Sequence, residues 1–344
     1  MATGSAVRQI EAPWVWTPTV LSGQSGWVFP LDDAALLEID KAYVQALDKL
    51  QGQKEKFATL TAADFPLPTL SEKLQKISAE ISDGRGLALL RGLPVEKYDR
   101  DELVIILWGL GSHLGVGISQ SYRGDMIGDV MDMSHEGDIR RAYRSPRPLY
   151  LHVDPVDIVG LLCLRPSRTG GQSLIASGLA IHNTILTERP DLMPYLYRGY
   201  YYHHSEAEST GEPPTTSYRV PVFKEVGGRI VCNFNANTIG RSIAEDGLEH
   251  DPQAIEAFEL FKEVTQRDEI VHRLNFEPGD LQLLNNRVMM HGRTEFDDWP
   301  EIERKRHLLR VWLMKPDWAT WPDDMHWRPA GHRLRGVKPA RETA

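Results

Sequence analysis

The chain has 344 residues, of which 41% are hydrophobic and 25% charged, and a formal net charge of -9 at pH 7. This composition is typical of a globular protein with a sizeable core. The acidic balance excludes nonspecific nucleic-acid binding, which needs clustered Lys and Arg to neutralise phosphates. No stretch reaches the ~18 consecutive apolar residues of a membrane span, and the N-terminus lacks the basic and apolar segments of an export signal. We therefore expect a cytoplasmic protein without nucleic-acid or membrane partners.

Cysteine usage agrees with that compartment. Cys163 and Cys232 are the two cysteines of the sequence, and each lies in an apolar or strand-like run. This pattern is typical of reduced, buried thiols rather than of a disulfide framework. A metal site in this protein would therefore depend on nitrogen and oxygen ligands.

Helical signals dominate the first part of the chain. Residues 1–30 are rich in Pro and Trp and are expected to form an extended arm. Apolar residues then recur at helical spacing from Asp32-Asp33 to about residue 47, and again over 71–84 and 99–114. Between the last two, residues 86–93 form a short apolar run bounded by glycines, which predicts a buried strand.

Strand signals dominate from residue 149 onward. Helices are expected near 178–187 and from Pro252, and the predicted strands cover 149–153, 160–164, 173–176, 200–204, 218–224, 229–233, 271–276, 281–285, 288–291 and 307–314. Many short strands with helices before and between them indicate an α+β protein with a β-sandwich or jelly-roll core. We expect one domain over 1–344, with an N-terminal arm and helices (1–85), the core (86–315) and a tail (316–344).

One histidine and one aspartate mark the centre of the predicted chemistry. His152 and Asp154 are two residues apart, so on a strand both side chains leave the same face of the sheet. With His291 from a second strand, they would form a 2-His-1-carboxylate set, which suits ferrous iron and leaves coordination positions open. A His-x-Asp pair alone is not specific, since a strand histidine is more often a hydrogen-bonded core or surface group.

Two further features accompany this set. Gly170-Gly171-Gln172-Ser173 precedes a predicted strand and, taken alone, is a turn. Arg306 and Arg310 are four apart and share a face of an otherwise apolar strand. A buried arginine is costly without an anionic partner, and a carboxylate would satisfy it in bidentate fashion.

The order His-x-Asp, Gly-Gly-x-Ser, distal His and then Arg resembles the taurine dioxygenase family of iron(II)- and 2-oxoglutarate-dependent oxygenases. The resemblance covers roughly residues 86–315, and the segments Gly86 to Pro94 and Asn286 to Arg293 add to it. It implies a double-stranded β-helix, which is the cupin-like form of the jelly roll. The motifs are specific as a set and unspecific singly.

The resemblance also implies the roles of individual residues. His152, Asp154 and His291 would hold Fe(II), and Arg306 with Ser173 would bind the distal carboxylate of 2-oxoglutarate. Arg310 would lie near this co-substrate or contact an anionic group of the substrate. The allocation between the two arginines stays open, because Arg306 lies at the long end of the usual spacing.

The implied reaction consumes O2 and 2-oxoglutarate, releases succinate and CO2, and oxidises an unactivated C–H bond of a small substrate. We expect a carboxylate, sulfonate or amino-acid-like molecule and hydroxylation by default, although other oxidative outcomes use the same site. The alternative is a cupin-like metal-dependent hydrolase or isomerase that does not use 2-oxoglutarate. Gln120, Tyr122, Arg123 and His203 are candidate substrate contacts, and the Trp-rich tail is compatible with a homo-oligomer.

Overall fold

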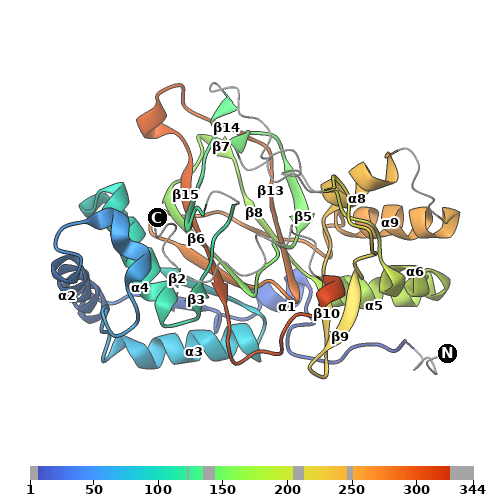
Figure 1. Cartoon of the computed structure of the whole chain (residues 1–344), viewed down its shortest axis with the longest axis horizontal. Helices are drawn as coiled ribbons and strands as arrows, with labels where there is room; N and C mark the ends of the chain where they lie inside the picture. The colour runs from blue at the N-terminus through green and yellow to red at the C-terminus, as the bar shows by residue number, and fades with distance from the viewer. Residues whose placement is uncertain (1–6, 122–123, 135–143, 204–212, 246–250, 326–344) are drawn as a thin grey trace.

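Two β-sheets face each other in the centre of the molecule (Figure 1). The computed structural model describes residues 7–121, 124–134, 144–203, 213–245 and 251–325. The larger sheet has seven strands in the order β1-β2-β12-β6-β15-β3, with β4 also paired to β15. The smaller has the order β11-β8-β13-β5. Within both sheets the pairs are antiparallel apart from β1 with β2.

The strand bounds follow the sheet order. The larger sheet consists of β1 (Val28–Pro30), β2 (Leu87–Arg91), β12 (Leu281–Asn285), β6 (Ile158–Arg165), β15 (His307–Met314), β3 (Val116–Gly117) and β4 (Ile127–Val130). The smaller consists of β11 (His272–Leu274), β8 (Ser173–Ser177), β13 (Met289–Arg293) and β5 (Leu149–His152). Two separate antiparallel pairs complete the strands of the described residues: β7 (Thr169–Gly170) with β14 (Phe296–Asp297), and the hairpin of β9 (Phe223–Val226) with β10 (Arg229–Cys232).

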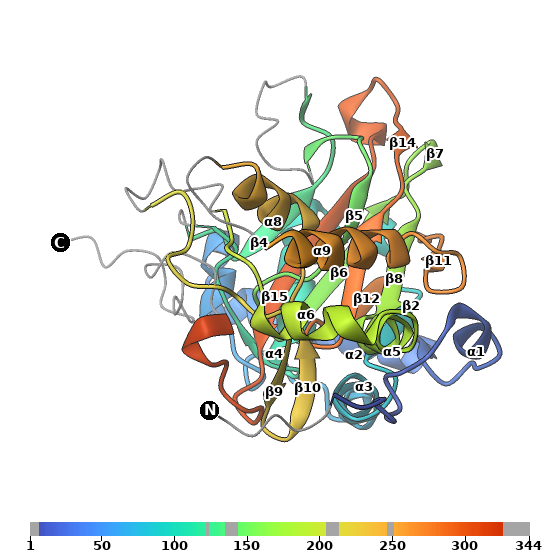
Figure 2. The same ribbon diagram turned by 90° about the vertical axis from the view of Figure 1, so that its right-hand side faces the viewer.

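The helices form two groups on opposite sides of the sheets, which Figures 1 and 2 show from two directions. The blue and cyan helices α2 (Asp33–Lys49), α3 (Leu70–Ser82) and α4 (Arg100–Ser112) cover the outer face of the larger sheet. The helices α5 (Gly178–Glu188), α6 (Met193–Arg198), α8 (Ala236–Ile243) and α9 (Pro252–Val264) lie on the other side. The other helical segments in the described part of the chain are α1 (Pro18–Ser22) and the 3-10 turns Lys54–Thr59, Val95–Lys97, Pro190–Leu192, Ile302–Arg304 and Asp323–Met325.

Strand alternation divides the core into two large apolar clusters. On β6, Leu161 and Cys163 point between the two sheets, whereas Leu162 points outward to the helices. Ile105 of α4 packs in that outer cluster, and Ile175 of β8 packs in the inner one. The few polar side chains on the inner faces are therefore surrounded by apolar residues, and these polar side chains form the candidate site.

Local signals correctly predicted several elements. The carboxylate of Asp32 accepts a hydrogen bond from the Ala35 N–H at the start of α2, as an N-cap does. Asp99 and Glu102 form a capping box at the start of α4. The strand, helix and hairpin predictions around 86–93, 178–187 and 226–228 agree with β2, α5 and the β9–β10 turn. Cys163 and Cys232 are buried and free, as expected.

Several details differ from the sequence-based predictions, and the strand predicted over 218–224 begins only at Phe223. The expected extended arm contains the short helix α1 and the strand β1, which pairs with β2 in parallel. Residues 200–204 do not form a strand in the described part, since Tyr200 and His203 make only isolated bridges. Helix α8 was not predicted. Asp154 lies two residues beyond the end of β5 rather than on a strand.

The division into one domain stays a prediction. Among the described residues, no helix has the length and apolar character to cross a membrane.

Candidate active site

Strand pairing brings the two predicted histidines side by side. His291 on β13 is the direct partner of His152 at the end of β5, and their ring centroids are 4.4 Å apart. Because directly opposed residues of an antiparallel pair point to the same face, both imidazoles face the interior between the sheets. The histidines are 139 positions apart in sequence (291 minus 152), and the sheet alone makes them neighbours.

Asp154 reaches the same point through a fixed turn. Its backbone N–H donates to Oδ1 of Asn286 over 3.2 Å, and the amide group of Asn286 donates back to the Asp154 carbonyl and to that of Val156. The N–H of Val153 donates to the Phe234 carbonyl at 3.0 Å. Asn286 is fully buried between β12 and β13. The hydrogen bonds of the Asn286 side chain therefore replace the strand pairing that Asp154 lacks, and they hold Asp154 beside the histidines.

The three side chains form a compact set of possible metal ligands. Nε2 of His152 lies 3.7 Å from Oδ1 of Asp154, and Nε2 of His291 lies 3.7 Å from Oδ2. All three residues are buried, and their potential ligand atoms lie within 4.8 Å of one another. Nδ1 of His152 lies 2.9 Å from the Tyr150 carbonyl, a contact that fixes the ring and directs Nε2 toward the centre. The donor set of two imidazoles and one carboxylate fits a ferrous ion.

Two neighbouring groups on β15 hold the carboxylate of Asp154. Nε1 of Trp312 donates to Oδ2 over 2.9 Å, and Nη1 of Arg310 donates to the same oxygen over 3.2 Å. Burial alone would raise the pKa of Asp154, but the charge of Arg310 and the two histidines lower it to about 2. Burial, with the charge of His152, lowers the pKa of His291 to about 3. The aspartate is thus anionic and the distal histidine neutral, which are the forms that bind metal.

Arg310 is itself oriented by Gln120. Oε1 of Gln120 accepts from Nε of Arg310 at 2.7 Å, and the Gln120 amide donates to the carbonyls of Arg310 and Met126. Gln120 was expected as a substrate contact, and the described contacts connect it instead to the arginine beside Asp154. A role toward substrate stays a prediction for both residues.

A second polar group lies further along the inner faces, around Arg306. Arg306 immediately precedes β15 and is 3% exposed, and among the described residues its Nη1 has no hydrogen-bond partner. Burial lowers the pKa of its guanidinium to about 10. Ser173 of β8 is also buried, and its hydroxyl donates to Oε1 of Gln282 on the facing sheet over 2.8 Å. Buried N–H groups without partners mark a place where a bound anion would fit.

The glycine pair before Ser173 makes room for that arginine. Gly171 has φ +69°, and a Cβ built there would collide with Oγ of Ser167 and lie 3.3 Å from Nε of Arg306. A side chain at position 171 would therefore be strained and would crowd the guanidinium. The Gly-Gly motif contributes space beside Arg306 as well as a turn.

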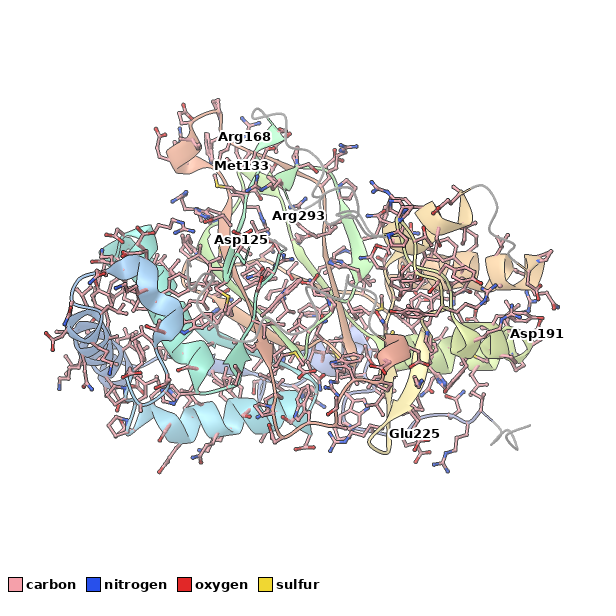
Figure 3. All side chains as sticks on the ribbon, in the orientation of Figure 1. Asp125, Met133, Arg168, Asp191, Glu225 and Arg293 are labelled. Atoms are coloured by element: carbon pink, nitrogen blue, oxygen red, sulfur yellow. The ribbon has the colours of Figure 1, made fainter. Side chains whose placement is uncertain are left out.

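Arg293, two residues after His291, is a third buried arginine of this region. Its Nη2 donates to the carbonyls of Ser145 and Arg147, and burial, with repulsion from Arg306, lowers its pKa to about 9. In Figure 3 its label lies among the central strands, whereas Asp191 marks the outer end of the helical side. Arg293 adds positive charge to the region around Arg306.

The remaining predicted contacts are less connected to this centre. His203 lies with Nδ1 3.7 Å from Glu245 and is outside the group of possible metal ligands. Tyr122 and Arg123 lie outside the described residues. Sequence reasoning did not single out Trp312 or Gln282. The position of Trp312, two residues after Arg310 on one strand face, is a signal that could have indicated it.

Comparison with known proteins decides the family. A sequence model of the Taurine catabolism dioxygenase TauD, TfdA family matches residues 49–312. The chain belongs to this family. The family consists of iron(II)- and 2-oxoglutarate-dependent dioxygenases, so the protein is an enzyme that uses Fe(II), 2-oxoglutarate and O2. This membership decides against the hydrolase or isomerase alternative.

Individual TauD/TfdA relatives cover nearly the whole chain. FR-33289 synthase from Streptomyces rubellomurinus (strain ATCC 31215) is 29% identical over 318 residues, which are 90% of this chain and 92% of the relative. The taurine hydroxylase-like protein SAT17 from Stachybotrys chartarum (strain CBS 109288 / IBT 7711) is 29% identical over 329 residues, 91% of this chain and 80% of the relative.

Solved structures establish the fold. An asparagine oxygenase in complex with Fe(II), 3-hydroxyasparagine and succinate superimposes with a TM-score of 0.65 at 17% identity, covering 84% of this chain and 93% of that one. The non-haem iron oxygenase OrfP in complex with Fe, succinate and (3S)-hydroxy-L-Arg gives 0.61 at 13% identity, covering 83% and 94%. The predicted α+β class with a jelly-roll core is thus confirmed.

Proposed function

We propose that this TauD/TfdA enzyme oxidises a C–H bond of a small amino-acid-like or otherwise anionic molecule, with iron held by His152, Asp154 and His291. The observation that carries this assignment is the convergence of three buried ligand atoms within 4.8 Å of one another. When bound, iron and 2-oxoglutarate would activate O2, which is the oxidant, and succinate and CO2 would be the by-products. The protein's own residues bind and orient these groups and exclude water.

The ligand residues are arranged to keep their metal-binding forms. The hydrogen bonds from Trp312 and Arg310 both end on Oδ2 of Asp154 and so favour the ionised carboxylate. The contact between Nδ1 of His152 and the Tyr150 carbonyl places a ring proton on Nδ1, which leaves Nε2 as the nitrogen that would bind metal.

Arg306 and Ser173 would bind the distal carboxylate of 2-oxoglutarate. A guanidinium that is 3% exposed, with an unpartnered Nη1 among the described residues, gains a charge-assisted hydrogen bond when a carboxylate arrives. The space that Gly171 leaves beside Nε supports the same role. Arg310 already donates to Asp154, so we assign the co-substrate to Arg306 and leave to Arg310 the position beside the metal and substrate.

The relatives support the substrate class. The solved asparagine oxygenase holds a hydroxylated asparagine and OrfP holds a hydroxylated arginine, so both contain products of amino-acid oxidation. An anionic group on such a substrate would be attracted by the positive charge of Arg310. Hydroxylation is the default outcome. The cytoplasmic location and a homo-oligomeric state stay predictions.

Anaerobic titration tests the metal and co-substrate assignments together. Adding 2-oxoglutarate to the Fe(II) protein should produce the weak visible charge-transfer band of a chelated 2-oxo acid. Arg306→Met should weaken 2-oxoglutarate binding about 100-fold, since a charge-assisted hydrogen bond contributes ~1.5–3 kcal/mol, and leave iron affinity unchanged. The matched control is Arg165→Met, because Arg165 is a nearby arginine whose Nε donates to the Lys305 carbonyl.

Three outcomes would contradict these assignments. Absence of the band in the unsubstituted protein would overturn the proposed chelate. Equal 2-oxoglutarate affinity in Arg306→Met and the unsubstituted protein would overturn the role of Arg306. A large loss in Arg310→Met without one in Arg306→Met would reverse the allocation of the two arginines.

A further inference from the structure

Gln282 is an amide inside an apolar strand. It is the second residue of β12, between Leu281 and Leu283, and it is 1% exposed. The residues opposite it on the two flanking strands, Leu89 and Leu161, are also apolar and buried. Neither flanking side chain can accept or donate a hydrogen bond to the Gln282 amide.

Only half of the Gln282 amide is satisfied. Its Oε1 accepts the hydroxyl of Ser173 across the two sheets at 2.8 Å. Its Nε2, which carries two N–H donors, is buried and has no partner among the described residues. A buried donor left unpaired is unfavourable, so an amide retained here indicates a partner that arrives from outside the chain.

The location indicates what that partner is. Ser173 belongs to the proposed carboxylate site with Arg306, and its hydroxyl fixes one end of the Gln282 amide. Leu161 pairs with both Gln282 and Arg310, so Gln282 lies on the inner face in one row with the arginine beside Asp154. The free Nε2 group thus belongs to the interior that the iron and co-substrate would share.

We propose that Gln282 is a further binding residue for 2-oxoglutarate, whose Nε2 donates to the distal carboxylate while Ser173 holds the amide in position. The inference rests on the proposed function, because it assumes the Arg306 carboxylate site. Arg306 supplies charge, and Gln282 supplies a neutral donor from β12 of the same sheet. Together they favour a 2-oxo acid with a second carboxylate over one without it.

The test is anaerobic titration of the full-length Fe(II) protein with 2-oxoglutarate, read by the charge-transfer band. Gln282→Met keeps the side-chain length and removes the amide, so 2-oxoglutarate should bind about 10-fold more weakly, as expected for one hydrogen bond to a charged group. Gln282→Glu adds a negative charge beside the carboxylate and should cause a larger loss. Iron affinity should stay within twofold in both variants.

Gln172→Met is the matched control. The side-chain amide of Gln172 donates to Asn275 at 3.0 Å. Gln172 is next to Ser173 in the sequence but lies outside the inner row. This variant should bind 2-oxoglutarate as the unsubstituted protein does. Ser173→Ala combined with Gln282→Met should lose less than the sum of the single losses in log Kd, because the hydroxyl orients the amide.

The outcomes separate the two hypotheses. If the unsubstituted protein gives no band, the proposed function fails. If it gives the band and Gln282→Met binds 2-oxoglutarate within twofold of it, the role of Gln282 is overturned. A purely structural role would lower the melting temperature of the metal-free protein and leave the Kd for 2-oxoglutarate unchanged, which also counts against the proposal.

Discussion

The indole N–H of Trp312 donates to Oδ2 of Asp154 over 2.9 Å, and so a tryptophan on β15 fixes the carboxylate that follows β5. Arg310, two residues earlier on the same strand face, donates to the same oxygen. Both side chains that donate to the proposed iron ligand Asp154 therefore lie on one face of β15.

We expect Trp312→Phe to weaken iron binding. The substitution keeps an aromatic ring and removes the donor, and loss of such a supporting contact typically lowers metal affinity ~10- to 100-fold. Titration with Fe(II) or Mn(II) measures the change. Trp108→Phe is the control, since its Nε1 donates to the Leu60 carbonyl in the outer core. Equal metal affinity in the two variants would refute the role of Trp312.

Gly171→Ala should lower both stability and co-substrate affinity. The residue has φ +69°, and its new Cβ would collide with Ser167 and crowd Nε of Arg306. We expect a loss of about 1–3 kcal/mol in the free energy of unfolding and weaker 2-oxoglutarate binding. Gly228 also has a positive φ, +78°, but no atom lies within 4 Å of an added Cβ. Gly228→Ala should therefore lower stability and leave 2-oxoglutarate binding unchanged. If Gly171→Ala binds 2-oxoglutarate normally, the glycine serves only the turn.

Asp157→Asn should destabilise the fold. The fully buried carboxylate accepts from Arg287 at 2.7 Å, from Nε1 of Trp321 at 2.7 Å and from the Lys315 N–H at 2.8 Å. Removing one charge of a buried pair typically costs about 3–5 kcal/mol, because the other charge is left unpaired.

Urea unfolding of the Asp157 variant measures this loss. Adding Arg287→Met to Asp157→Asn should cost less than the two single losses combined. Glu259→Gln removes an exposed partner of Lys262 and should cost under about 1 kcal/mol. A loss of that small size for Asp157→Asn would contradict the prediction.

Both thiols should be unreactive in the native protein. Burial raises the pKa of Cys163 from 9.0 to about 12 and also raises that of Cys232. At pH 8 each thiol stays protonated, so thiol reagents should modify both only in urea. Between pH 9 and about 12 unfolding releases the Cys163 proton, and stability should fall as pH rises through this window. Rapid native labelling of either thiol would contradict the assignment.

Local sequence signals determined much of this protein. The caps Asp32 and Asp99 act within three residues of their partners, so the starts of α2 and α4 are readable from neighbouring residues. The order of His152, Asp154, Ser173, His291 and Arg306 was sufficient for the resemblance to the family. Periodicity alone did not determine burial, since Leu37 and Val44 match the helical pattern of α2 yet are 54% and 63% exposed.

The contacts that support the site join residues far apart in the sequence, so local signals could not predict them. The contact of Asn286 with Asp154 spans 132 positions, that of Trp312 with Asp154 spans 158, and that of Ser173 with Gln282 spans 109. Each depends on which strands are neighbours or face one another, because a hydrogen bond requires a donor and an acceptor within about 3 Å. The candidate ligands and their order can be read from the sequence, whereas their meeting depends on the pairing of β5 with β13 and on the packing of the two sheets.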